Sequence, residues 1–121
     1  MCAHDGAGDG SDGRLAALGT SGVANETLVI VHADHGWSLG EHGEWEKFTN
    51  WEHGTRVPLS VMAPWAAGSA GTVVSDVVQL VDVFPTMAEL AGVPAPASYG
   101  LDGASLAPYV IGSGDNGSQW A

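Results

Sequence analysis

The chain has 121 residues and a formal net charge of -11, from 14 acidic side chains against 3 basic ones. A surface that binds nucleic acid or an anionic membrane needs clustered Lys and Arg, and the only basic residues are Arg14, Lys47 and Arg56. Cys2 is the single cysteine, so an internal disulfide and a cysteine-rich metal site are excluded. We therefore expect one modest globular domain that binds neither nucleic acid nor a membrane.

The N-terminal part of the sequence begins with little to bury. Residues 1–12 are rich in Gly, Asp and Ala, which predicts a disordered start, and they hold no secretion signal, so we expect any such signal upstream. Arg14–Leu18 is predicted to be the last turn of a helix that Gly19 closes. Thr27–Val31 is a short, apolar, β-branched run without alternation, a pattern typical of a strand buried on both faces of a parallel sheet.

A long polar segment follows, from residue 36 to residue 56. Loops of this length without an element of their own are usually functional or disordered, and its three tryptophans argue for order. We expect at least two of them to pack the loop onto the core, with stacking on a sugar ring as the alternative. They are Trp37, Trp45 and Trp51. Val57–Met62 is predicted to be a second strand that starts near a sheet edge, because Pro58 has no N–H to donate.

Beyond the second strand, residues 76–81 are predicted to be extended and to lead into a helix. Asp82 is predicted to be the N-cap of that helix, with Pro85 in its first turn and Gly92 as the residue that closes it. A further short turn is expected within residues 101–110. The order helix, strand, loop, strand, helix defines an α/β protein. Two or three strands make an incomplete sheet, so we expect the chain to be a piece of a larger domain.

Two candidate metal ligands, Asp34 and His35, directly follow the first predicted strand. In open α/β sheets the loops at the carboxyl ends of the strands form the ligand crevice, and Gly36 allows a backbone turn that would aim both side chains at one ion. On chemistry alone, a carboxylate with an imidazole suits zinc, manganese or iron better than calcium. The alternative is that Asp34 caps the loop and His35 is half-buried without a ligand, and the pair by itself does not decide between the two.

Several spaced stretches carry a family resemblance. They are DHGWSLGEHGEWEK at residues 34–47, TRVPL at 55–59, LVDVFPT at 80–86 and LDGASL at 101–106. Together they resemble the sulfatase family of the alkaline phosphatase superfamily, in particular its iduronate-2-sulfatase-like branch. The resemblance covers residues 13–110 and leaves residues 111–121 as a tail. It implies the C-terminal part of a sulfatase catalytic domain, a partial alkaline-phosphatase-like α/β fold with an incomplete mixed or parallel sheet and flanking helices.

The resemblance implies a role for three of the residues. Asp34 and His35 would be two ligands of a catalytic calcium ion. Lys47 would reach the sulfate group of the substrate and offset the charge that develops on the leaving oxygen, a role that suits a compact ammonium group. The alternative for Lys47 is a surface ion pair with Glu44 or Glu46.

Other residues are given lesser roles. His42 either lines the substrate pocket or satisfies the backbone of the loop, and we favour the second. His53 is predicted to be structural or exposed, and Arg56 is predicted to pair with an acid at the base of the loop. Asn25–Thr27 and Asn116–Ser118 match the short glycosylation sequon.

The sequence departs from the family at the nucleophile. Sulfatases make formylglycine from a cysteine in a Cys-x-Pro-Ser-Arg motif, and Cys2 is followed by Ala3 and His4 instead. We therefore expect a fragment that is inactive by itself, from a secreted, periplasmic or lysosomal sulfuric ester hydrolase. Its substrates would be small sulfate esters or sulfated glycans, such as 2-sulfated iduronate. The alternatives are a non-catalytic, metal-binding remnant of the fold and a related phosphatase or phosphodiesterase.

Overall fold

The computed structural model describes residues 11–66, 70–95 and 100–112. Most of the predicted start at residues 1–12, Cys2 and the sequon at Asn116 lie outside these ranges. The helices are α1 (Ser11–Thr20), α2 (Glu52–Thr55), α3 (Val83–Leu90) and α4 (Ala107–Ile111), with 3-10 turns η1 (Ala24–Glu26), η2 (Glu41–Gly43) and η4 (Leu80–Asp82). The strands are β1 (Val29–His32), β2 (Ser38–Leu39), β3 (Trp45–Glu46) and β4 (Leu59–Met62). The α/β class is confirmed.

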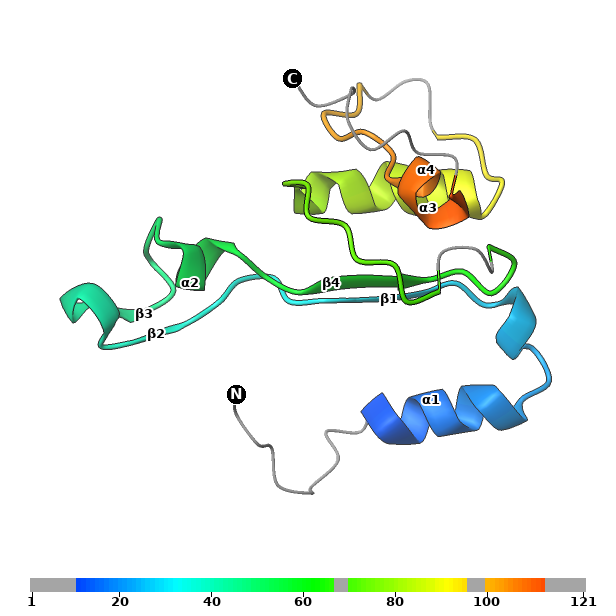
Figure 1. Ribbon diagram of the computed structural model, residues 1–121, viewed down its shortest axis with the longest axis horizontal. Helices are drawn as coiled ribbons and strands as arrows, with labels where there is room; N and C mark the ends of the chain where they lie inside the picture. The colour runs from blue at the N-terminus through cyan, green and yellow to red at the C-terminus, as the bar shows by residue number, and fades with distance from the viewer. Residues whose placement is uncertain (1–10, 67–69, 96–99, 113–121) are drawn as a thin grey trace.

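The central feature is a two-stranded sheet of β1 and β4, with α3 and α4 on one side and α1 on the other (Figure 1). The two strands are antiparallel, with Ile30 opposite Val61, so the predicted parallel neighbour of β1 is not among the described residues. The face that carries Ile30 and Val61 is turned toward the helices. The opposite face stays open, since Val31 is 57% exposed and Met62 46%. The prediction of a strand buried on both faces is therefore wrong for the described chain, because only one layer packs closely on the sheet.

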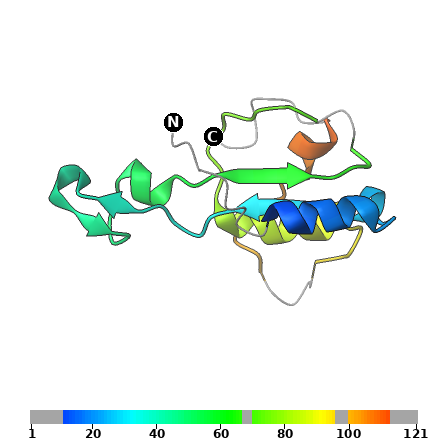
Figure 2. The ribbon, with the colours of Figure 1, turned by 90° about the horizontal axis from the view of Figure 1, so that it is seen from below.

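The core of the described chain is small. Ala63, Ala66 and Val110 form its buried cluster, and three half-buried apolar side chains pack against them, Leu28, Val61 and Leu90. These residues come from the end of β4, from α4, from the start of β1 and from α3. The cluster therefore fixes the sheet under α3 and α4, and it leaves the opposite end of the molecule to be held by other contacts (Figure 2).

Two buried polar side chains of the α3 region hold the C-terminal segment in place. The Asp82 carboxylate accepts hydrogen bonds from the backbone N–H groups of Gln79 (2.8 Å) and Ala104 (2.9 Å). The Thr86 hydroxyl donates to the Asp82 carbonyl and accepts the Leu106 N–H at 2.8 Å. We call Asp82, Thr86, Ala104 and Leu106 the clasp. Asp82 is the N-cap residue of α3 as predicted, but its carboxylate makes no capping bond to α3; it caps η4 and binds Ala104 instead.

The ends of the helices differ in how well they follow the predictions. Gly92 closes α3 as predicted, with a φ of +66°. Its N–H donates to the Glu89 carbonyl and the Val93 N–H donates to the Ala88 carbonyl, which is the pattern of a Schellman motif. Helix α1 continues through Gly19 to Thr20, because the Thr20 hydroxyl satisfies the Ala16 and Ala17 carbonyls. The chain then turns at Gly22, whose φ is +81°.

Two further segments depart from the sequence expectation. Residues 76–81, predicted to be extended, bend at Asp76, are extended at Gln79 and already enter the 3-10 turn η4 at Leu80. The segment 36–56, which we call the loop region, contains the short hairpin of β2 and β3, the turn η2 and the helix α2. It extends away from the β1–β4 sheet at one end of the molecule (Figure 1). The loop region is therefore ordered by its own short helices and strands, which the sequence did not predict. No helix in the described ranges is long and apolar enough to cross a membrane.

Candidate active-site segment

Asp34 and His35 lie just past the end of β1, as the sequence predicts. The His35 Nδ1 lies 2.7 Å from the Gly36 carbonyl oxygen. A carbonyl only accepts hydrogen bonds, so Nδ1 carries a proton, and in the neutral imidazole Nε2 then holds the lone pair. Nε2 lies 3.4 Å from the Asp34 carboxylate. In the neutral imidazole two acceptor atoms thus face each other, an arrangement that either a proton between the two atoms or a shared cation relieves.

The donor set at this point fits a metal ion in part. The Asp34 side chain is 82% exposed and that of His35 31%, so a cation has access to both. Fixing one ring nitrogen by a backbone carbonyl is how metal-binding histidines are usually oriented. Within the described ranges, no third His, Cys, Asp or Glu completes a group able to hold a metal ion. Two ligands are too few for calcium, which takes six to eight oxygens, so further donors are required.

The backbone after the ligand pair lies directly against helix α2. The Gly36 N–H donates to the Gly54 carbonyl at 2.8 Å. A β-carbon at Gly36 would collide with the His53 carbonyl oxygen, so glycine is needed here for close approach. Its φ is not in the left-handed region, and the backbone bend of this segment lies at Asp34 instead of at Gly36. Contact with α2 therefore fixes the direction in which His35 leaves the strand.

Lys47 lies in the exposed turn that follows β3. Its backbone carbonyl accepts the Thr49 N–H at 2.9 Å, while its side chain forms no ion pair with any described residue. The alternative that paired Lys47 with Glu44 or Glu46 is therefore not observed. The ammonium group is available to an external anion.

Three aromatic rings stack beside this turn. His42 lies 4.1 Å from Trp51 and 5.7 Å from His53 between ring centroids, with interplanar angles of 16°. The His53 Nε2 is 3.0 Å from the hydroxyl of Ser38, which is fully buried. The structural role predicted for His53 is confirmed. His42 has a φ of 54°, is exposed, and stacks through its ring on Trp51 and His53; a place in the substrate pocket stays a prediction.

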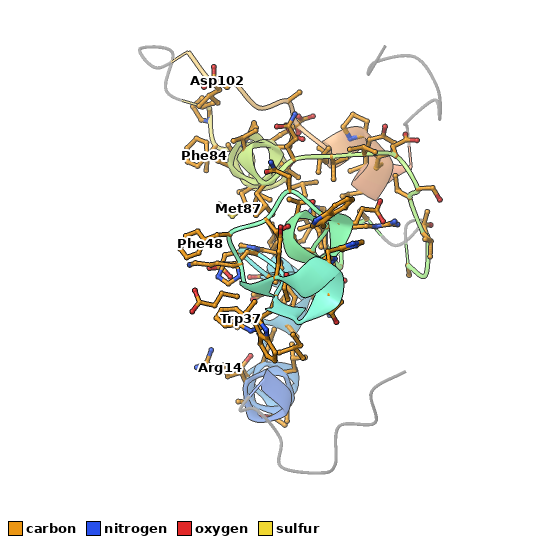
Figure 3. The ribbon with its side chains drawn as sticks, turned by 90° about the vertical axis from the view of Figure 1, so that its left-hand side faces the viewer. Arg14, Trp37, Phe48, Phe84, Met87 and Asp102 are labelled. Atoms are coloured by element: carbon orange, nitrogen blue, oxygen red, sulfur yellow. The ribbon has the colours of Figure 1, made fainter. Side chains whose placement is uncertain are left out.

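The tryptophans of the loop region are exposed. Trp37 is 52% exposed, Trp45 68% and Trp51 50%, so the expectation that two of them pack the loop onto the core is wrong. The hairpin extends beyond the sheet, and no described layer lies over these rings. Trp37 and Phe48 project from the same side of the molecule (Figure 3). Trp37 also lies beside the ligand pair, at 6.1 Å from the His35 ring.

Electrostatics in the loop region centre on Glu41. The Leu39 N–H donates a hydrogen bond to the Glu41 carboxylate, and this bond is the main reason that the pKa of Glu41 lies below its usual 4.5. The backbone N–H of Glu41 and the nearby rings of His53 and His42 lower that pKa further. Arg56 pairs with Glu52 at 3.7 Å within one turn of α2, as the sequence predicts for a residue at the base of the loop. Both charged groups are exposed, so this pair contributes little to stability.

A surface hollow elsewhere in the fold does not contribute to this site. It is lined by Asn25, Glu26, Thr27, Leu28, Trp65, Leu90 and Ala91. These residues surround the beginning of β1, whereas Asp34 and His35 follow its end. None of the residues that we expected to bind metal or sulfate lines this hollow.

The comparisons with known proteins fit this arrangement. A family model for sulfatases matches residues 13–93, so the chain belongs to the sulfatase family. Iduronate 2-sulfatase of Mus musculus is 40% identical over 105 residues, an alignment that covers 68% of this chain and 19% of that protein. The matched range of the family model includes Asp34, His35 and Lys47. The rest of the predicted range, from residue 94 to residue 110, lies outside the family match.

Solved structures confirm the partial alkaline-phosphatase-like fold. A phosphonate monoester hydrolase from Silicibacter pomeroyi superposes with a TM-score of 0.76 and 34% identity, over 91% of this chain and 21% of that one. A protein in complex with its substrate D-glucosamine-2-N,6-O-disulfate gives 0.75 and 34%, over 90% and 22%. The chain thus spans about a fifth of the length of these proteins.

Sequence reasoning missed the residues that join the two halves of the site. Gly54 contacts the segment 34–36, which we call the ligand loop, Thr49 contacts the Lys47 turn, and Ser38 bonds to His53 of α2; none of the three is a titratable or metal-binding type. The sequence offered no signal for Gly54, because the helical turn that contains it was not predicted.

Proposed function

We propose that this chain supplies part of the active site of a sulfuric ester hydrolase. The observation that carries the proposal is the orientation of His35, whose Nε2 faces the Asp34 carboxylate at 3.4 Å at the end of β1. Asp34 and His35 would hold a calcium ion, which supplies positive charge to the bound sulfate. Further oxygen ligands would have to come from other parts of the catalytic domain, since two donors do not fill a calcium shell.

Lys47 is the proposed sulfate contact. Its ammonium group is exposed and unpaired within the described chain, so it can bind a sulfate oxygen without first breaking an ion pair. As the ester bond breaks, charge builds on the leaving oxygen, and a fixed ammonium stabilises that charge more than it stabilises the ground state. The nucleophile would come from a Cys-x-Pro-Ser-Arg motif, which is absent from the 121 residues. We therefore expect the chain alone to show no turnover.

The proposed substrate class is a sulfated sugar. A relative is an iduronate 2-sulfatase, and one structural neighbour was solved with a disulfated glucosamine as its substrate. 2-Sulfated iduronate is the specific substrate that we propose. The exposed rings of Trp37 and Phe48, on one side of the loop region, offer apolar faces of the kind that sugar rings stack against.

A second function rests on the other structural neighbour, which is a phosphonate monoester hydrolase. The test is a substrate panel on the complete enzyme that contains this chain: a 2-sulfated iduronate glycoside, an aryl sulfate and a phosphonate monoester, with calcium present. Highest kcat/KM on the sulfated sugar supports the proposal. Preference for the phosphonate would favour the second function, and no turnover on any of the three would favour the non-catalytic, metal-binding remnant.

A further inference from the structure

Helix α2 contacts both loops that carry the proposed site residues. On one side, Gly36 follows the ligand His35 and donates its N–H to the Gly54 carbonyl at 2.8 Å. The backbones pack so closely that a β-carbon at Gly36 would collide with His53. The ligand loop therefore cannot shift along α2 without breaking this contact.

On its other side, α2 contacts the turn that carries Lys47. Gly54 is buried, and a β-carbon placed on it would lie 2.5 Å from the Thr49 methyl group and 3.9 Å from the Lys47 carbonyl oxygen. The Thr49 N–H donates to that Lys47 carbonyl at 2.9 Å, and the Thr49 hydroxyl accepts the Trp51 N–H at 3.2 Å. Thr49 therefore fixes the backbone of Lys47 and rests on the open face of Gly54.

A side-chain contact holds α2 in this position. The His53 ring reaches the buried Ser38 hydroxyl at 3.0 Å, and the ring of His42 stacks on it. Ser38 belongs to β2, which begins two residues after Gly36, so this bond and the Gly36–Gly54 bond join the same two segments. Two bonds to one segment resist rotation as well as translation of α2.

We propose that Gly54 is a positioning residue, which sets the place of Lys47 relative to Asp34 and His35. Its carbonyl holds the ligand loop while its bare α-carbon lets the Thr49 turn approach. The inference rests on the proposed function, because it matters only if Lys47 contacts sulfate. A methyl group at this position would push the Lys47 turn outward, and displacement of a catalytic group by about 1 Å costs roughly 100-fold in rate.

The test is the Gly54→Ala variant of the complete sulfatase, with and without Thr49→Ser. Gly54→Ala is expected to lower kcat/KM for a sulfate ester by about 100-fold and to raise the inhibition constant of inorganic sulfate, with calcium content unchanged. Thr49→Ser deletes the colliding methyl and keeps the hydroxyl that Trp51 needs. The double variant is therefore expected to recover most of the lost activity and sulfate affinity.

Gly19→Ala is the matched control, because Gly19 lies in α1 without a positive φ, and a β-carbon added there would meet no atom within 4 Å among the described residues. It is expected to leave both constants unchanged. If Gly54→Ala only reduces the amount of folded enzyme, Vmax falls while the inhibition constant of sulfate stays the same. That pattern, or a double variant no better than the single one, overturns the inference.

A second variant covers the case in which Gly54→Ala does not fold. Thr49→Ala removes the methyl contact and the bond from Trp51 without adding bulk, so the fold should survive and the Lys47 turn should loosen. We expect a higher inhibition constant for sulfate and a lower kcat/KM, and unchanged sulfate inhibition overturns the inference.

Lys47→Ala separates the two proposals: if it keeps full activity, the proposed function and the inference both fall. If Lys47→Ala is impaired while the Gly54 and Thr49 variants are inhibited normally by sulfate, only the inference falls.

Discussion

In the clasp, buried polar side chains join segments that are far apart in the sequence, whereas in the loop region a backbone contact between two glycines is joined by one side-chain bond, from His53 to the buried Ser38. Thr86 is 1% exposed and Asp82 5%, and each binds the N–H of a residue some twenty positions away. In the loop region the corresponding contact is between Gly36 and Gly54, and the large side chains around it are exposed.

This difference suggests that the clasp contributes to the stability of the fold, whereas the loop region presents the candidate site residues. A buried hydroxyl or carboxylate that satisfies backbone groups cannot also serve a ligand, so the clasp is suited to holding α3 against the C-terminal segment. Where backbones are fixed through glycines, the Lys47 side chain stays unpaired within the described chain, and the Asp34 side chain stays 82% exposed although its carboxylate accepts the His35 N–H. Changes in the clasp should therefore alter folding, and changes in the loop region should alter metal binding and turnover.

The largest expected effect is that of Asp34→Ala in the complete sulfatase. Loss of a charged ligand leaves the remaining shell unable to hold a hard cation tightly, so we expect no detectable activity and a lower calcium content by elemental analysis. Asp102→Ala is the control in the C-terminal segment, since Asp102 is also an exposed aspartate (Figure 3). Normal calcium content and turnover in Asp34→Ala would remove Asp34 from the metal site.

Lys47→Ala should lower turnover without affecting folding. We expect a loss of about 100-fold in kcat/KM, the usual scale for one group that stabilises an oxyanion. The melting temperature should not change, because an exposed, unpaired charge contributes little stability. Arg14→Ala, which removes another exposed positive charge in α1, should retain full activity. A lower melting temperature with normal activity of the folded enzyme would make Lys47 structural.

Thr86→Val tests the clasp. Valine keeps the shape of threonine but leaves the buried Leu106 N–H without its acceptor, at a cost of about 1 to 3 kcal/mol in the free energy of unfolding. Urea titration measures that loss, and kcat/KM of the folded enzyme should stay unchanged. Thr72→Val is the matched control at an exposed position and should change stability by less than about 0.5 kcal/mol. Lower activity with unchanged stability would contradict the division between the two regions.

The sequence predicted the parts of this structure that depend on local signals. The strand that ends before Asp34, the second strand after Pro58 and the closure of α3 at Gly92 follow from β-branched runs and from turn residues. The pairing of β1 with β4 was not predictable, because a run of apolar residues does not say which neighbour it will have. The exposure of the tryptophans was missed for a related reason, since the hairpin that carries them extends beyond the core.

The site shows the same limit. Asp34, His35 and Lys47 could be proposed from the sequence, the first two because their side chains suit a metal ion and all three through the family resemblance. Gly54 and Ser38 act through packing and one hydrogen bond each to distant segments, which only the folded chain brings together. Their contribution depends on tertiary contacts, and single-sequence patterns contain little information about these.

The smallest expected effect is on the pH dependence of stability and concerns Glu41, whose carboxylate interacts only with residues of the loop region. Its pKa is lowered by the Leu39 N–H, so the folded state binds its proton less tightly than the unfolded state, whose value is near 4.5. The resulting stabilisation is therefore fully present above pH 4.5 and is lost as the pH falls through the lower, folded-state pKa. We expect the stability difference between the native protein and Glu41→Gln to shrink over that interval, and the carboxyl carbon of Glu41 to titrate below 4.5 by NMR. A midpoint at or above that value would mean that the Leu39 bond is not formed in solution and that η2 is not ordered by it.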